Sequence, residues 1–332
     1  MHDQDMKTLW ISWYPHRRTT GLSAAWSIPL EVVTSRHTGL RKWAAQAIKT
    51  LRLLRRDRPD VLFVQNPSLG ATVLALLVRP WFRYQLVVDA HNEGVRPFIR
   101  SGRWIDWLTK QLLKRADFTI VTNAALAKDV RLAGGRPLIL PDPLPTPAPI
   151  NATARVDAAD IMVISTFAPD EPLYEILKAA AGMSDVRFAV TGNPRNLSFQ
   201  GSTLPANVRL TGYLPEDEYW AMLAFARVVV DLTLMPDCLV CGAYESLAAA
   251  RPMVLSDNEP SRALFGKVAI LTRSDSISIA NAIRAALAKQ NQLEAAARDA
   301  RAAYHSDWKM QADSVWDEVV SAAVSDRRHR AS

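Results

Sequence analysis

The segment DCLVCGAYESLA (residues 237–248) decides the fold of the second half of the chain, because it joins an apolar run to a helix through small residues. The apolar run, Val228–Leu232, is a predicted strand, and the helix is expected over Ala243–Ala250. A helix N-terminus has free N–H groups and the positive end of the helix dipole, so this turn can bind a diphosphate. Glu245, in the first helical turn, can accept hydrogen bonds from sugar or ribose hydroxyls. It is equally consistent with a purely stabilising role at the helix dipole.

Short apolar runs alternate with helical patterns along the whole chain. The second half has further predicted strands at Ile161–Ser165, Val186–Thr191, Val208–Thr211, Met253–Ser256 and Ala269–Leu271. The first half has them at Thr8–Trp13, Pro29–Thr34, Asp60–Gln65, Gln85–Ala90, Phe118–Thr122 and Leu138–Leu140. Its predicted helices are Leu40–Arg56, Leu69–Val78, Trp104–Arg115 and Ala124–Leu132. Continuous apolar runs indicate strands buried on both faces of parallel sheets, and the alternation indicates βαβ units. The sequence therefore predicts doubly wound α/β domains.

The boundary between two such domains is expected at a proline-rich connector. Prolines alternate with other residues from Pro141 to Pro149, which excludes a regular helix and favours an extended linker. We place the N-terminal domain at residues 1–145 and the C-terminal domain at residues 146–332, with the option that the last helix packs back on the first domain. Ligands of parallel sheets bind beyond the carboxyl ends of the strands, so the candidate residues are those that follow strands.

The spacing of Asp237 and Glu245, followed by SLAAARPMVLSD (246–257), resembles the donor-binding segment of GT-B glycosyltransferases. The resemblance is to the family-4-like group of bacterial polysaccharide enzymes. Other segments are similar to the same family, namely DAHN (89–92), DFTIVTN (117–123), LILPDP (138–143), FAVTGN (188–193) and VRLTGYLP (208–215). The resemblance implies a GT-B fold, in which two Rossmann-like domains with parallel sheets face each other across a cleft. It also implies transfer of a sugar from a nucleoside diphosphate sugar.

The resemblance assigns roles to residues of the donor site. Glu245 would hold the ribose, Asp237 would contact the hydroxyls of the transferred sugar, and the amides of Gly242 and Ala243 would meet the phosphates. The other donor-binding residues that it implies are Gly21, Gly192, Asn193, Arg195, Gly212 and Tyr213. Of these, Arg195 is a candidate substitute for a missing basic pair, with a solvent-exposed arginine as the alternative.

Catalytic roles follow from the same resemblance. His91 would reach the transferred sugar, although a histidine after a strand is also typical of a structural hydrogen-bond partner. Either Glu93 or Asp89 could act as a general base if the enzyme inverts, with Asp89 expected to be buried at the strand end. The catalytic set is thus His91, Asp237, Glu245 and Glu93, and the family-4 resemblance favours retention of configuration over inversion.

Two departures from the family concern the donor site. The segment STFAPDEP (165–172) has two acids where family members commonly have an arginine and a lysine for the diphosphate, and the leading acid of the pair is Asp237, one methylene shorter than the family's glutamate. The chain has no Asp-x-Asp metal motif beyond Asp3 and Asp5, which precede the first predicted strand, and this absence suits GT-B enzymes. We therefore expect a hexosyltransferase without metal or other cofactor, in which the helix dipole and side chains stabilise the leaving diphosphate.

The charge of the chain is unevenly distributed. The net charge is +7, and residues 1–150 have a net charge of +11 and seven of the ten tryptophans, whereas residues 151–332 have −4. Basic and aromatic residues alternate in Arg41–Arg58, Arg79–Arg83 and Arg96–Arg115, which suits an anionic bilayer surface. Solvated helix faces are the alternative for each stretch, and no nucleic-acid-binding motif accompanies the charge, so a nucleic-acid partner is not expected. Arg17 and Arg18 are expected to meet an anionic acceptor or to lie in a solvated loop.

The N-terminus is polar, and no apolar run approaches the ~20 residues that span a bilayer. We therefore expect a cytoplasmic protein, peripheral on the inner face of the plasma membrane. The expected acceptor is a polyprenyl-diphosphate-linked glycan in bacterial polysaccharide assembly. The alternatives are a GT-B-fold nucleotide-sugar epimerase and a non-catalytic membrane-associated assembly subunit.

Overall fold

The computed structural model of the 332-residue chain describes residues 6–66, 68–97, 102–149, 159–193, 195 and 204–331. Asp3 and Asp5 lie outside the described residues, as do residues 98–101 of the basic stretch Arg96–Arg115. The chain forms two compact units. Unit 1 comprises Met1–Pro143 and Asp307–Ser332, and unit 2 comprises Leu144–Ser306.

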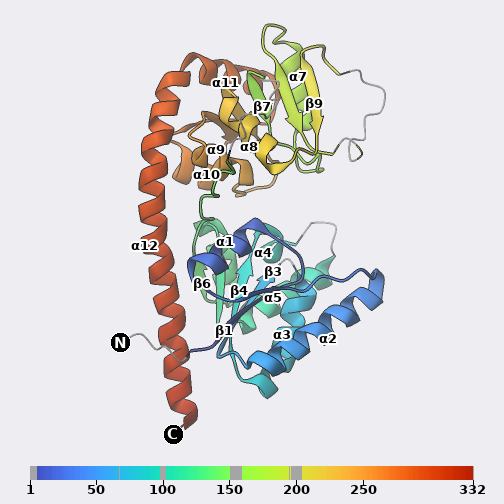
Figure 1. The fold of residues 1–332 in the computed structure, drawn as a ribbon, viewed down its shortest axis with the longest axis vertical. Coiled ribbons are helices and arrows are strands. Elements are labelled where there is room, and N and C mark those ends of the chain that lie inside the picture. The colour runs from blue at the N-terminus through green and yellow to red at the C-terminus, as the bar shows by residue number, and fades with distance from the viewer. Residues whose placement is uncertain are drawn as a thin grey trace. The chain divides into compact units, whose positions relative to one another are not determined.

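Unit 1 contains a parallel sheet whose described strands follow the order β2-β1-β3-β4-β5-β6 (Figure 1). The strands are β1 (Thr8–Ser12), β2 (Leu30–Val32), β3 (Val61–Asn66), β4 (Gln85–Ala90), β5 (Phe118–Val121) and β6 (Pro137–Ile139). Each predicted strand of the first half is present, and the central strands β3, β4 and β5 are buried over their whole length, as their apolar runs predict. The chain order reverses at β1, which lies between β2 and β3, so a ligand site is expected at the carboxyl ends of β1 and β3.

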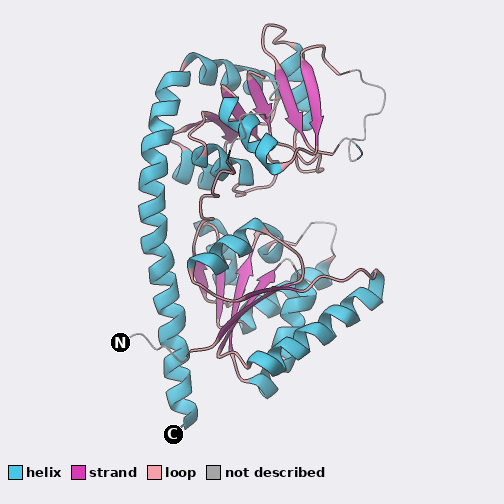
Figure 2. Cartoon of the chain, in the orientation of Figure 1, coloured by secondary structure: helices cyan, strands magenta, loops and turns pink. Residues whose placement is uncertain are grey.

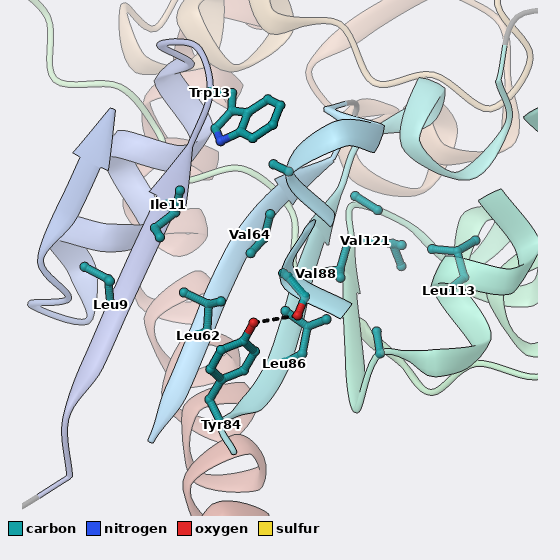
Figure 3. Packing of buried hydrophobic residues seen from close by; sticks show 14 of the residues in the cluster. Leu9, Ile11, Trp13, Leu62, Val64, Tyr84, Leu86, Val88, Leu113 and Val121 are labelled. Atoms are coloured by element: carbon teal, nitrogen blue, oxygen red, sulfur yellow. Dashed lines mark hydrogen bonds between the residues drawn. The ribbon is translucent and has the colours of Figure 1, made fainter. Parts of the chain in front are cut away.

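Helices cover both faces of this sheet. One face packs against α2 (Gly39–Asp57), α3 (Leu69–Phe82), α5 (Arg103–Arg115) and α6 (Ala124–Leu132). Figure 3 shows part of this core, with Leu62, Val64 and Val88 pointing to the same side and the Tyr84 hydroxyl donating a hydrogen bond to the Ala75 carbonyl at 2.5 Å. The opposite face packs against α1 (Arg17–Ala25) and the last part of α12 (Gln290–Ala331).

Helix α1 is not among the predicted helices of the first half. The His16 side chain accepts a hydrogen bond from the Arg18 amide and caps the helix, and Leu22 on its inner side is fully buried. Helix α12 is also longer than any predicted helix. It begins in unit 2, and its residues from Asp307 onward belong to unit 1, where Val315 and Val319 are buried in the core.

Unit 2 has the sheet order β12-β11-β10-β7-β8-β9, again with parallel neighbours. Figure 2 distinguishes the helices and strands of the chain by colour. Its described strands are β7 (Ile161–Val163), β8 (Phe188–Thr191), β9 (Val208–Gly212), β10 (Val228–Asp231), β11 (Met253–Ser256) and β12 (Ala269–Thr272). Helices α7 (Leu173–Ala181) and α11 (Ser276–Ala288) pack on one face, and α8 (Glu216–Phe225) and α9 (Cys241–Ala248) on the other. The short helices α4 (Asn92–Val95) and α10 (Glu259–Phe265) follow β4 and β11. The order reverses between β7 and β10, which predicts a ligand site at the carboxyl ends of these two strands.

Candidate active site

In unit 2, Asp231 lies at the reversal point, because it is the last residue of β10. Its carboxylate is buried and accepts a hydrogen bond from the Gly242 amide at 2.9 Å. A Cβ atom at residue 242 would collide with this carboxylate and would lie 2.6 Å from a methyl group of Ile164. Glycine is therefore required at residue 242 for α9 to begin this close to β10.

Glu245 adds a second buried carboxylate to the same place. It lies in the second turn of α9, and the Tyr219 hydroxyl of α8 donates a hydrogen bond to it. Burial, followed by the negative charges of Glu245, Glu171 and Asp170, raises the pKa of Asp231 to about 8. Four carboxyl groups therefore gather at this edge, and Asp231 is protonated at neutral pH.

Two acids replace the family's basic pair. The Asp170 carboxylate accepts a hydrogen bond from the Thr233 hydroxyl at 3.2 Å, and Glu171 folds back onto its own loop. The Glu171 carboxylate accepts hydrogen bonds from the amides of Thr166 (2.9 Å) and Phe167 (3.0 Å), and from the hydroxyls of Ser165 (2.5 Å) and Thr166 (2.7 Å). Phe167 adopts a left-handed φ of 61°, which helps to turn successive amides toward one anion. We call this arrangement of residues 165–167 around Glu171 the amide cradle. It has the donors that a phosphate group would need, and Glu171 occupies them here.

The amides of Gly242 and Ala243, at the start of α9, were expected to meet the phosphates of the donor. The Gly242 amide donates to Asp231, and the Ala243 amide donates to the Val240 carbonyl at 3.2 Å. Both expected phosphate donors therefore have partners within the protein. Asp237 lies half-buried in the loop before α9 with a left-handed φ of 55°.

The remaining donor-site candidates of unit 2 follow β8 and β9. Gly192 touches the amide cradle, since a Cβ atom there would lie 2.6 Å from the Ser165 carbonyl oxygen. Arg195 is exposed, and its amide donates to the Asn193 side chain at 3.1 Å. Gly212 has a left-handed φ of 73°, and the adjacent Tyr213 is 90% exposed. The tyrosine that contacts Glu245 is Tyr219, which was not predicted.

In unit 1, Arg18 is fully buried, which contradicts the expectation that it meets an acceptor or solvent. Its guanidinium donates to Asp89 at 2.8 Å, to Asp142 at 2.5 Å and to the Leu140 carbonyl at 3.0 Å. The expected burial of Asp89 at the end of β4 is confirmed. Arg18 therefore joins α1, β4 and the segment after β6, and its charge is balanced within the core.

His91 lies directly beside this ion cluster. Its Nε2 atom is 3.8 Å from Asp89 Oδ2, and its ring centroid is 4.1 Å from that of His16. Burial lowers the pKa of His91 to about 4 and also lowers the pKa of His16. Glu93 lies on α4. The pKa of Tyr14, which follows β1, is raised by burial and then by the negative charge of Glu93. These side chains form a polar edge at the carboxyl ends of β1 and β4.

Gly21 is not in a loop near this edge. It is the fifth residue of α1, and a Cβ atom there would lie 2.6 Å from the Pro143 ring. The glycine therefore allows close packing of α1 on the segment after β6, and its role in the donor site stays a prediction.

Sequence reasoning missed Asp231, Glu171 and Tyr219 as members of the unit 2 cluster. Asp231 had a usable signal, because an acid that ends the run VVVD lies at the carboxyl end of a buried strand. Tyr219 had none, because its contact with Glu245 depends on how α8 packs. Within the described residues, no group of three or more His, Cys, Asp or Glu side chains is arranged to hold a metal ion.

Comparisons with known proteins agree with this architecture. Residues 8–140 match the family described as glycosyl transferase 4-like domain, and residues 173–314 match the family described as glycosyl transferase-like. A search of curated proteins returns no match.

Solved structures with similar folds cover nearly the whole chain. Sucrose-phosphate synthase from Thermosynechococcus elongatus has a TM-score of 0.73 and 14% identity, over 95% of this chain and 100% of that one. Anabaena HepE, solved in complex with UDP-glucose, has a TM-score of 0.72 and 17% identity, over 96% and 100%. The UDP-GlcNAc 2-epimerase from Methanocaldococcus jannaschii is more distant, with a TM-score of 0.56 and 12% identity, over 85% and 93%. A glycosyltransferase domain family thus matches each half of the chain, and the two Rossmann-like units have the GT-B fold of these solved structures.

Proposed function

We propose that the chain transfers a hexosyl group from a nucleoside diphosphate sugar to a polyprenyl-diphosphate-linked glycan in bacterial polysaccharide assembly, without metal or other cofactor. The observation that carries the donor half of this proposal is the buried Glu245 carboxylate, fixed by Tyr219 at the reversal point of the unit 2 sheet. A carboxylate in this place can accept both hydroxyl hydrogens of a ribose. UDP-sugars are the first donors to test, because HepE was solved with UDP-glucose.

The lipid acceptor and the membrane location rest on the surface of unit 1. Four tryptophans on neighbouring helices are each more than half exposed, Trp43 on α2, Trp81 on α3, and Trp104 and Trp107 on α5. The exposed Leu40, Ile48 and Leu77 lie on α2 and α3. Exposed basic residues accompany them, namely Arg41, Lys49, Arg52, Arg55, Arg83, Arg103, Lys110 and Lys114. We call these residues the aromatic surface.

Aromatic and basic side chains together suit the interface of an anionic bilayer, where indole rings lie at the headgroup level. We propose that unit 1 uses the aromatic surface to bind the cytoplasmic face of the plasma membrane and so meets a lipid-linked acceptor. No described helix is long and apolar enough to cross a bilayer.

Incubation of the purified protein with UDP-, GDP-, ADP- and dTDP-sugars tests the activity, with a polyprenyl-diphosphate glycan in vesicles and with EDTA present. We expect one donor to release its nucleoside diphosphate and to extend the glycan. Glu245→Ala should abolish the transfer, whereas Glu259→Ala, an exposed acid on α10, should not. Consumption of no donor would favour the non-catalytic alternative, and conversion of the donor without any acceptor would favour an epimerase.

A further inference from the structure

We propose that a cavity on unit 1 binds the phosphomonoester headgroup of an anionic lipid, with Arg83 and Arg115 as the residues that contact the phosphate. The inference rests on the membrane location proposed for unit 1 and deepens it, because it names the lipid chemistry that this surface selects. The lipid in question is not the sugar acceptor, as the place of the cavity in the fold shows.

The cavity lies at the amino ends of β4 and β5. It has a volume of about 560 Å³ and is lined by Leu76, Arg79, Pro80, Arg83 and Arg115. These residues belong to the second half of α3, to the residue that caps α3 and to the end of α5. The six residues of β4 span roughly 20 Å, so the cavity is remote from the carboxyl ends of the strands, where ligands of parallel sheets bind. A ligand held here is therefore not the acceptor that reacts.

Arg79 builds the cavity. Its guanidinium donates hydrogen bonds to the Tyr84 carbonyl at 3.2 Å and to the Arg115 carbonyl at 3.3 Å, and it forms an ion pair with Asp117 at 2.7 Å. Since Tyr84 and Asp117 directly precede β4 and β5, these bonds join the ends of α3 and α5 to the start of both strands. Asp117 balances the Arg79 charge, so Arg79 is a positioning residue, and the positive charge of the cavity comes from the other two arginines.

Arg83 and Arg115 have the charge and the donors that a phosphomonoester needs. Both are exposed, and none of the described residues that line the cavity is acidic. Arg115 donates to the carbonyl of Gln111 at 3.3 Å and to its side-chain oxygen at 2.6 Å, and both of these acceptors are neutral. Guanidinium groups bind phosphate oxygens through paired hydrogen bonds, and two of them match the roughly 1.5–2 negative charges of a phosphomonoester at neutral pH. A phosphodiester headgroup has only one charge.

The helix ends beside the cavity oppose an anion less than the arginines favour it. The ends of α3 and α5 each add a negative partial charge of about half a unit. Their carbonyl groups already accept hydrogen bonds, because the Arg79 carbonyl accepts the Arg83 amide at 2.7 Å and the Arg115 carbonyl accepts the Arg79 guanidinium. Two full positive charges on Arg83 and Arg115 therefore outweigh the two partial charges.

Arg83 has a backbone conformation that favours glycine. It caps α3 with a left-handed φ of 58°, which a residue without a Cβ atom adopts with less strain. The helix end itself therefore gives no reason for an arginine at this position, whereas a phosphate ligand does.

The cavity borders the aromatic surface. Leu77 and Trp81 lie on α3 one position beyond the cavity residues Leu76 and Pro80, and they are 64% and 73% exposed. Successive helix positions are roughly 100° apart, so this apolar pair flanks the cavity. An indole ring at the headgroup level of a bilayer brings the phosphates of that leaflet to the arginines. This arrangement favours a lipid over a soluble phosphate compound as the occupant.

Sedimentation with two kinds of vesicle tests the lipid chemistry. One kind contains phosphatidate, a phosphomonoester, and the other contains phosphatidylglycerol, a phosphodiester, at equal zeta potential. We expect about tenfold tighter binding to phosphatidate, since charge-assisted hydrogen bonds distinguish the two headgroups. Glycerol phosphate, the soluble form of the headgroup, should displace the protein only at a far higher concentration, because it makes no contact with Leu77 or Trp81. Displacement at a concentration comparable to that of the lipid would overturn a lipid as the occupant.

The double variant Arg83→Gly with Arg115→Gln tests the two residues. It should bind both kinds of vesicle alike, with a thermal unfolding temperature close to that of the wild type. Arg58→Gly with Lys114→Gln is the matched control, because Arg58 caps α2 with a left-handed φ of 44°, Lys114 precedes Arg115 on α5, and neither residue lines the cavity. The control should weaken binding to both kinds of vesicle equally and keep the preference for phosphatidate.

The outcomes separate the inference from the proposed function. Equal binding of the wild type to both kinds of vesicle, or a preference that survives the loss of Arg83 and Arg115, would overturn the headgroup site and leave the membrane location standing. Binding to no anionic vesicle would overturn the site and the membrane location together, while sugar transfer by the same protein would still stand on its own assay.

Discussion

At Gly242 a methyl group has no room. The added Cβ would collide with the Asp231 carboxylate and lie 2.6 Å from a methyl group of Ile164. Moving the carboxylate away to relieve this collision would break its 2.9 Å hydrogen bond from the Gly242 amide. We expect Gly242→Ala to lower the free energy of unfolding by about 1–3 kcal/mol, as overpacking does in cores. Gly182→Ala is the matched control, because the nearest atom is 3.5 Å away there and the backbone φ is −79°. Urea denaturation of both variants measures the difference, and equal stabilities would contradict the account of Gly242.

The raised pKa of Asp231 makes stability depend on pH. The folded protein keeps this proton up to about pH 8, whereas the unfolded chain loses it near 3.8, so the folded state loses stability as pH rises through this window. Asp231→Asn should remove that loss, which amounts to at most about 1.4 kcal/mol per pH unit. Urea denaturation at pH 5 and pH 8 should show that the free energy of unfolding of the variant, relative to that of the wild type, is higher at pH 8 than at pH 5. An identical pH dependence of the two proteins would show that Asp231 is ionised in the folded state.

The location of a single residue could be predicted from the sequence where the residue directly follows or ends a predicted strand. Asp89 and His91 follow an apolar strand, and their place at its carboxyl end follows from parallel topology. Arg18 could not be assigned, because its charge suggested solvent while its two carboxylate partners lie 71 and 124 residues away. Gly21 illustrates the same limit, since only the packed structure shows that Pro143 lies against it.

The loop that joins β7 to α7 binds its own carboxylate. Glu171 fills the amide cradle and adds a negative charge where a diphosphate is expected. A unit charge at ~10 Å contributes roughly 1–2 kcal/mol at an effective dielectric constant of 20, so Glu171→Gln should bind a nucleoside diphosphate roughly tenfold more tightly. Calorimetry with UDP and with pyrophosphate measures this effect, and Glu259→Gln is the control. Weaker binding by Glu171→Gln would instead show that Glu171 shapes the loop for the ligand.

The strands and most helices were predicted from the sequence, whereas helix α1 was not and the length of α12 was missed. The strands β3, β4, β5, β7, β8, β10 and β11 are buried over their whole length, so burial on both faces fixes their place, whereas the edge strands β2 and β9 are only partly buried. Helix α1 begins RRTTG, which has no apolar periodicity, and its formation depends on the His16 cap and on the burial of Leu22. The length of α12 was missed for a related reason, because its buried positions such as Ala312 and Val319 lie among many charged residues.

At the scale of the whole molecule, the charge asymmetry predicts which unit binds a membrane. We expect the protein to sediment with vesicles that contain an anionic lipid, less so as salt rises, and not with zwitterionic vesicles. Substitution of Trp104 and Trp107 by glutamine should weaken binding at least about tenfold, because two indole rings leave the interface. Substitution of Tyr174 and Ile277, exposed on unit 2, by glutamine is the matched control. Equal binding by both double variants would contradict a membrane role for the aromatic surface.

The central claim is that unit 2 binds a nucleoside diphosphate sugar through Glu245. Thermal unfolding with UDP-, GDP-, ADP- and dTDP-linked sugars tests it most directly, because a ligand of the folded state raises the melting temperature by mass action. The account predicts a rise with one nucleotide class, lost in Glu245→Ala and kept in Glu259→Ala. A rise that survives Glu245→Ala, or no rise with any of the four classes, would contradict it.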